Sequence, residues 1–234
     1  MTTTQGARAR ARIEITAAIK DEARRQLAAE GAAKLSLRAV ARELGMVSSA
    51  LYRYFPSRDD LLTALIIDAY DSVGAAAERA HATAETAAPG DHLAHWTATC
   101  RAVRAWAVEH PHEYALIYGS PVPGYTAPQD TVVPASRVGL VLISVARAAY
   151  GDKGIALPPL PEVLRAEAER LAAGVAPDLP PPLVATLVST WAQLFGLISF
   201  EVFGQFNNIV EDRDTFFANA AERLGRESGL LPKP

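Results

Sequence analysis

The sequence predicts an all-α fold, and three observations support this prediction. Alanine and arginine are abundant, apolar residues recur at helical spacing, and clusters of β-branched residues are few. Segments rich in Pro and Gly separate the helical stretches. Half of the 234 residues are hydrophobic, so the chain can form a real core as one large domain or two unequal ones.

The N-terminal part of the chain predicts three helices. An apolar stripe begins at Ile13, and Gly31 supplies a stop signal for the first helix. Ser36 is placed to cap the second helix, because its hydroxyl can accept hydrogen bonds from the first free backbone amides. Gly45 then allows a tight turn, since glycine adopts a left-handed backbone at little cost. The three helices are expected over Ala11–Glu30, Leu37–Leu44 and Ser48–Tyr54.

Longer helices are predicted for the rest of the chain. Arg58 begins the first of them, and Asp91 and Asp212 are placed to cap later ones. Prolines at 180–182 precede the longest helix. We expect these helices over residues 58–81, 92–110, 113–118, 134–149, 162–173, 182–208 and 213–227.

Charge is distributed unevenly along the chain. The first 62 residues hold 11 Lys/Arg and 7 Asp/Glu, whereas the remainder holds 12 and 19. A basic front with an acidic rear favours contact between the front and phosphates. The single cysteine, Cys100, excludes an internal disulfide and fits a reducing cytoplasm. We expect neither a secretory signal at the start, which lacks an apolar run, nor a membrane span in Trp191–Phe206, which polar residues interrupt.

The segment from Leu35 to Leu62 carries the most specific pattern, two short helices joined by a glycine turn. The second helix has a polar face with Ser48, Ser49, Arg53 and Tyr54, while Val47, Leu51 and Phe55 recur at the spacing of an inward face. A short helix of this kind fits the major groove of DNA. Ser49 and Ala50 would let the backbone approach the bases, and Arg53 would reach phosphates.

This segment resembles the DNA-binding domain of the TetR family of transcriptional repressors. The matching features are Arg38 in the capped second helix, the Glu43-Leu44-Gly45 turn, the Leu51-Tyr52 pair and the run from Tyr54 to Arg58. The likeness covers about residues 11–65. Family members often have His at the position of Tyr54 and Lys at that of Arg58, and both replacements keep a donor for phosphate.

The resemblance implies a homodimeric repressor that binds a palindromic operator in double-stranded DNA and is released by a small-molecule effector. It implies a cytoplasmic protein with no catalysis and no cofactor. A helix-turn-helix head would occupy residues 1–57, and a helical body for ligand binding and dimerisation residues 58–234. The residue pattern and the resemblance together give the DNA-contacting candidates Ser36, Arg38, Ser48, Ser49, Ala50, Tyr52, Arg53, Tyr54 and Arg58. Arg8, Arg10 and Arg12 form either an arm along a groove or phosphates, or a solvated tail.

The helix from Trp191 onward is apolar on nearly all sides, so it must bury two faces. Either a second subunit covers one face, or the helix is wholly internal. The segments Arg104–Tyr125 and Trp191–Gly196 also resemble one regulatory-domain subtype of the family, in which the last two long helices pair with their twins. The interface candidates are Trp191, Phe195, Ile198, Val202, Phe203 and Phe206.

Aromatic residues of the middle segment can line a ligand cavity or simply pack in the core. The cavity candidates are Trp96, Cys100, Trp106, Tyr114, Tyr118 and Tyr125. No metal site is predicted: His92 and His95, like His110 and His112, lack a completing thiol or carboxylate and are expected at the surface. Two other functions stay open, a helical enzyme with an aromatic-lined cavity and a sequence-nonspecific DNA-binding protein.

Overall fold

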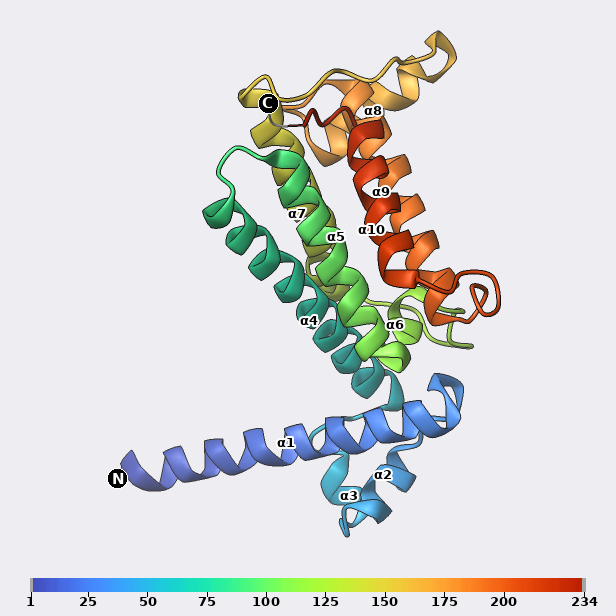
Figure 1. Ribbon diagram of the computed structural model, residues 1–234. Helices are drawn as coiled ribbons and strands as arrows, with labels where there is room; N and C mark the ends of the chain where they lie inside the picture. Colours follow the sequence, from blue (N-terminus) through green and yellow to red (C-terminus); the bar gives the residue numbers. More distant parts are fainter. Residues whose placement is uncertain (1, 233–234) are drawn as a thin grey trace. The chain divides into compact units, whose positions relative to one another are not determined.

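The computed structural model describes residues 2–232, and these residues confirm the all-α prediction (Figure 1). They contain ten α-helices and three short 3₁₀ helices, and the pairing of Ile155 with Leu230 is an isolated bridge. The elements are α1 (Thr2–Glu30), η1 (Ala32–Lys34), α2 (Leu37–Glu43), α3 (Ser48–Leu51), α4 (Arg58–Ala87), α5 (His92–Glu109), α6 (Pro111–Tyr118), η2 (Gln129–Thr131), α7 (Val132–Gly151), η3 (Glu162–Leu164), α8 (Arg165–Val175), α9 (Pro181–Val202) and α10 (Arg213–Glu227).

The chain forms two compact units. Unit 1 comprises the residues up to Tyr70 together with His110–Pro134, and unit 2 comprises Asp71–Glu109 together with the residues from Ala135 onward. Helix α4 therefore contributes its first turns to unit 1 and its later turns to unit 2. The predicted division into functional domains at residue 57 stays a prediction.

Unit 1 has a core built by four helices. Its buried side chains include Ile19, Ala23 and Leu27 of α1, Leu37, Val40 and Ala41 of α2, Leu51 of α3, and Leu61, Leu62 and Leu65 of α4. The predicted helix cap and glycine turn beside this core are confirmed. The Ser36 hydroxyl accepts a hydrogen bond from the amide of Ala39 at 3.4 Å, and Gly45 adopts φ 64° in the turn after α2.

Some predictions for unit 1 are wrong. Helix α1 begins at Thr2 instead of Ala11, and Ile13, expected to point inward, is 70% exposed. Val47, expected on the inner face of the third helix, is 70% exposed because it occupies the N-cap position of α3. The helical hydrogen bonding of α3 ends at Leu51, after which tight turns continue to Phe55.

Unit 2 is organised around α5, which packs against α9 and α10. Trp96 is fully buried, and its indole Nε1 donates to the carbonyl of Ala221 at 3.0 Å. Arg104 donates to the carboxylate of Glu201 at 2.6 and 2.7 Å, and to Asp214 at 2.6 Å. The mostly buried guanidinium of Arg104 thus joins α5 to α9 and α10, and two carboxylates compensate its charge.

The predicted caps of unit 2 are confirmed, whereas some helix ends differ. Asp91 accepts from the amide of Ala94 and Asp212 from that of Thr215, each at 2.9 Å. Helix α4 runs six residues past the predicted end at His81, and α9 ends at Val202 instead of Asn208. Gly204 stands in the turn that follows α9, with φ 83°.

Two stretches, Gln129–Gly151 and Pro181–Val202, are long and apolar enough to cross a membrane by length and composition alone. Core helices of water-soluble helical proteins share these properties. The pattern is therefore weak evidence for a membrane span.

The expectation that His92 and His95 lie at the surface is wrong, because they are only 6% and 3% exposed. His92 Nε2 lies 3.0 Å from a carboxylate oxygen of Asp152, and His95 Nε2 lies 2.8 Å from the carbonyl oxygen of Ala88. The ring of His81 stands 5.8 Å from that of His95, between their centroids. The turn between α4 and α5 brings these rings together, which the spacing within one helix does not reveal.

The first prediction concerns pH and His81. Burial lowers the pKa of His81, and His95 and His92 lower it further, whereas Glu85 opposes them. A folded-state pKa below the ordinary value of about 6.5 means that this group stabilises the fold above that pH and loses the contribution as pH falls. Thermal unfolding should therefore show a smaller loss of unfolding temperature for His81→Gln than for the wild type between about pH 7.5 and about pH 5.5. An equal fall in unfolding temperature for both proteins would contradict this prediction.

Candidate nucleic-acid interface

Helix α3 is anchored from one side and exposed on the other. Leu51 is fully buried and Phe55 nearly so, and both belong to the core of unit 1. The outer side carries Ser49, Tyr52 and Arg53, which are exposed. Ser48, Ala50 and Tyr54 are half-buried at its edges. The anchor fixes the direction of the polar face, which is the condition for a helix that reads a groove.

Arg12 of α1 holds the far end of this segment. Its guanidinium donates to the carbonyl of Arg53 at 3.4 Å and lies 5.1 Å from the ring centroid of Tyr54. Sequence analysis treated Arg12 only as part of an arm or a tail. The missed signal was its position seven residues before Ile19, two helical turns along the face that becomes buried.

The second-helix candidates differ in how they are engaged. The Ser36 hydroxyl oxygen caps α2, and its hydrogen remains able to donate. Arg38 is exposed on α2. Both residues therefore have donors that a phosphate at this end of α2 would accept.

Arg58 serves the fold of unit 1 directly. Its Nη2 donates to the carbonyls of Ala32 and Ala33 at 2.8 and 3.3 Å, and Nη1 lies 3.5 Å from Asp59. The guanidinium thus fastens η1 to the start of α4. Its predicted contact with a phosphate stays a prediction.

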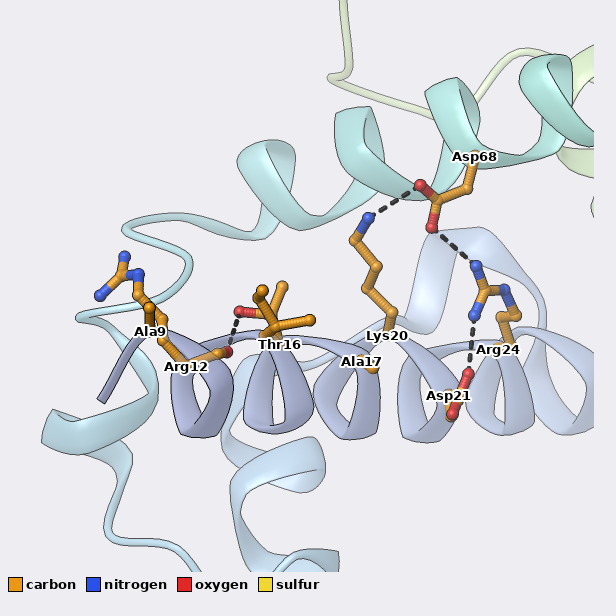
Figure 2. A pocket seen from close by; sticks show the side chains of 9 residues that line it. Ala9, Arg12, Thr16, Ala17, Lys20, Asp21, Arg24 and Asp68 are labelled. Carbon is orange, nitrogen blue, oxygen red and sulfur yellow. Dashed lines mark hydrogen bonds and ion pairs between the residues drawn. The ribbon is translucent and has the colours of Figure 1, made fainter. Parts of the chain in front are cut away.

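A network of ion pairs connects α1 to α4 and α6 within unit 1. Figure 2 shows the part of it that joins Lys20 and Arg24 of α1 to Asp68 of α4. Arg24 pairs with Asp68 at 2.7 Å and with Glu113 at 3.0 Å, and Lys20 pairs with Asp68 at 2.8 Å. Arg12, Lys20, Arg24 and Asp68 also border an open cavity of about 600 Å³ along α1. The charges of this cavity wall are largely used within the protein.

The six cavity candidates belong to different compact units. Trp96, Cys100 and Trp106 lie on α5 in unit 2, and Tyr114, Tyr118 and Tyr125 lie in unit 1. Trp106 Nε1 donates to Ser72 Oγ at 2.9 Å, and burial raises the pKa of the Cys100 thiol far above its ordinary value. Cys100 is therefore protonated and inert.

The tyrosines of unit 1 do gather, with partners that sequence analysis missed. The ring of Tyr118 stands 5.9 Å from that of Tyr70 and 5.1 Å from that of Tyr114, between centroids. Thr63 and Tyr125 share a hydrogen bond of 2.9 Å. Burial raises the pKa of Tyr118 and of Tyr70, so both hydroxyls stay neutral. Unit 1 also has a cavity of about 430 Å³, bordered by η1 and α6 and by none of the six candidates.

Helix α9 has an uncovered apolar face in unit 2. Phe200 and Phe203 are exposed on the side of Gly196, Phe200 by 53%. Trp191 is also exposed, but it lies nine residues before Phe200 and thus on the opposite side of the helix. A side chain at Gly196 would meet no atom within 4 Å. Phe195 and Ile198 point inward and are buried, while Val202 and Phe206 are half-buried.

Two family models match separate segments of the chain. Residues 19–65 match the family model described as bacterial regulatory proteins of the tetR family, and residues 96–224 match the tetracyclin repressor-like C-terminal domain. HTH-type transcriptional regulators of Mycobacterium tuberculosis and Mycobacterium bovis are 43% identical over 204 residues, which is 86% of this chain and 86% of each relative.

Solved structures agree in fold. The crystal structure of the regulatory protein SCO4313 has a TM-score of 0.74 at 35% identity, covering 92% of this chain and 97% of that one. A protein of unknown function from Rhodococcus sp. RHA1 has a TM-score of 0.70 at 21% identity, covering 93% and 95%. The second likeness supports the fold alone.

The second prediction concerns Arg58. Arg58→Ala removes a charged donor from two backbone carbonyls, so the free energy of unfolding should fall by about 1–2 kcal/mol. Urea unfolding measures the change, with Arg38→Ala as the matched control because Arg38 is exposed on α2. If both variants unfold at the wild-type midpoint, the contact with η1 contributes nothing to stability.

Proposed function

The chain belongs to the TetR family of bacterial transcriptional regulators, and we propose that it represses transcription as a homodimer until a small-molecule effector releases it. It is a DNA-binding regulator and not an enzyme, as its relatives are named transcriptional regulators. The helical-enzyme alternative is therefore wrong. The operator, the dimer and the effector are the parts proposed.

The observation that carries the proposal is the anchored helix α3 with its exposed polar side. Ser49, Ala50 and Tyr52 would face base edges in the major groove, since small side chains allow close approach. Arg38, Arg53 and Arg58 would meet phosphates, which fix the register of the protein on the duplex. Ser36, Ser48 and Tyr54 complete the proposed contact set. An acidic remainder of the chain disfavours the sequence-nonspecific alternative.

The third prediction tests sequence reading. Selection from a pool of random duplexes should enrich a roughly palindromic site, and Ser49→Val should enrich a different site, because valine offers no hydrogen bond to a base. Arg58→Ala is the control: it should weaken all duplexes about equally and reduce the slope of log affinity against log salt by roughly one per contact. Enrichment of one and the same site by wild type and Ser49→Val would place Ser49 away from the bases.

The domain division that we propose assigns residues 1–57 to DNA binding and residues 58–234 to ligand binding and dimerisation. The compact units are divided elsewhere, since unit 1 also contains residues 58–70 and 110–134, and α4 supplies residues to both units. A ligand-induced change at the later turns of α4 would reach the helices that surround α3 through the same helix. Such a ligand shifts DNA affinity only by its differential affinity for the two states.

The aromatic residues of the middle segment support a small-molecule effector of apolar character. Trp96, Cys100 and Trp106 of unit 2 and Tyr114, Tyr118 and Tyr125 of unit 1 remain the proposed contacts. Burial raises the pKa of Tyr118, and its neighbour Tyr70 is affected in the same way, so both hydroxyls stay neutral; this favours an effector that donates or accepts hydrogen bonds without a strong charge. A regulator that binds chromosomal DNA in a bacterium acts in the cytoplasm, which we propose as its location.

The uncovered face of α9 supports a homodimer. Apolar patches of this kind on a monomer are rare unless a partner covers them. Gly196 would allow a second helix to approach closely, since it carries no side chain. We propose Gly196, Phe200 and Phe203 as the centre of the contact, with Val202 and Phe206 at its edge. Trp191 lies nine residues before Phe200, on the opposite side of α9, so we propose it as a separate part of the interface. Phe195 and Ile198 are buried within the subunit, so we propose that they support the interface by packing beneath the exposed residues.

The fourth prediction tests this interface. Gly196→Glu should leave the subunit fold intact, because open space surrounds the position and Glu favours a helix over Gly. The buried carboxylate would be costly in a dimer, so sedimentation should show monomers. The matched control is Gly139→Glu on α7, another helical glycine with open space around it. A folded, fully dimeric Gly196→Glu protein would remove this face of α9 from the interface.

A further inference from the structure

Helix α1 extends well beyond the core that it covers. Ile19 is the fully buried residue of α1 that lies nearest to the N-terminus, whereas the side chains of residues 6–14 are all exposed. At 1.5 Å per residue, Arg8 lies about 16 Å along the helix from Ile19. Figure 1 shows these first turns projecting past the segment that contains α3. The extension is unexplained by the packing of unit 1.

The arginines of the extension divide between two faces. The helix rotates by about 20° less than two full turns over the seven residues from Arg12 to Ile19. Over the eleven residues from Arg8 to Ile19 it rotates by about 20° more than three full turns. Arg8 and Arg12 therefore continue the face that buries Ile19. Nine residues separate Arg10 from Ile19, which is two and a half turns, so Arg10 lies on the opposite face.

The contacts of Arg12 show that this face of α1 lies against the segment that follows α3. Arg12 reaches the carbonyl of Arg53 and the ring of Tyr54, at the end of the segment that carries the polar side of α3. One turn farther out, Arg8 lies beyond that segment on the same side. A guanidinium there adjoins the DNA-binding surface without being used by the fold.

We infer that the first turns of α1 extend the DNA interface, with Arg8 contacting backbone phosphates beside the bases that α3 reads. This inference rests on the proposed role of α3. The partner is the phosphate backbone and not a base edge, because a helix is about 10–12 Å wide and the minor groove about 6 Å. The major groove of the half-site is taken by α3. Charge complementarity and continuity with the α3 surface both favour this partner.

The experiment compares Arg8→Gln with Arg10→Gln. Both residues are exposed and glutamine is an equally good helix former, so the fold should be unaffected. The probe is the duplex enriched by selection, with long flanks, and affinity is measured over a range of salt concentrations. Arg8→Gln should reduce the slope of log affinity against log salt by about 0.9 per subunit, roughly two in a dimer. Arg10→Gln should keep the wild-type slope.

A second duplex, trimmed to the bases read by α3, removes the proposed phosphates. On it, wild type and Arg8→Gln should bind alike. Wild-type slopes for Arg8→Gln on the long duplex would overturn the inference. Equal reductions by Arg8→Gln and Arg10→Gln would also overturn it, because they would indicate diffuse attraction instead of a contact.

Failure of the proposed function gives a different result. If selection enriches no duplex, sequence-specific repression is wrong, and the same comparison on a long duplex of random sequence still decides the inference. Phosphate contacts are independent of sequence, so the difference between Arg8→Gln and Arg10→Gln should persist there. If the two variants have the same slope on that duplex, the proposed phosphate contact of Arg8 is wrong as well.

Discussion

The burial of Leu51 and Phe55 is the interaction on which the DNA-binding surface depends. Helix α3 has four residues, and the nucleation factor of about 10⁻³ for an isolated helix corresponds to roughly 4 kcal/mol against its formation. Two buried side chains of this size contribute about 1.5–3 kcal/mol each, enough to offset that cost. The polar side of α3 is therefore ordered by the core beneath it, and Arg12 and the Gly45 turn fix its two ends.

Sequence reasoning succeeded where local chemistry decides the structure. Ser36, Asp91 and Asp212 cap their helices as expected, because a short polar side chain before a helix satisfies amides close to it in the chain. It failed where burial depends on distant segments. Ile13 fits an apolar stripe but lies past the end of the core, and His95 is polar but enclosed after α4 folds back onto α5. Periodicity identifies a face of a helix, not the length over which a neighbour covers it.

The same contrast separates the two kinds of candidate site. The proposed DNA-contacting residues come from one continuous segment, so the spacing in the sequence indicated which of them share the exposed side of α3. A cavity is formed by residues from several helices, and no spacing in the sequence reports it. Tyr70 and Thr63 join the tyrosines of unit 1 from α4, and neither was among the candidates. Trp96 satisfies its indole nitrogen inside unit 2, as expected for a packing residue.

The ion pairs of unit 1 refine the argument from net charge. A basic N-terminal part suggests many cations for DNA, yet Lys20 and Arg24 are compensated by the carboxylates of Asp68 and Glu113. These charges stabilise the scaffold and contribute little to the field outside it. Exposed cations outside these pairs include Lys34 of η1, Arg38 of α2, Arg53 after α3 and the arginines on the first turns of α1. In the complex that we propose, these cations and Arg58 set the affinity for phosphates, so the position of a cation on its helix matters more than the total charge.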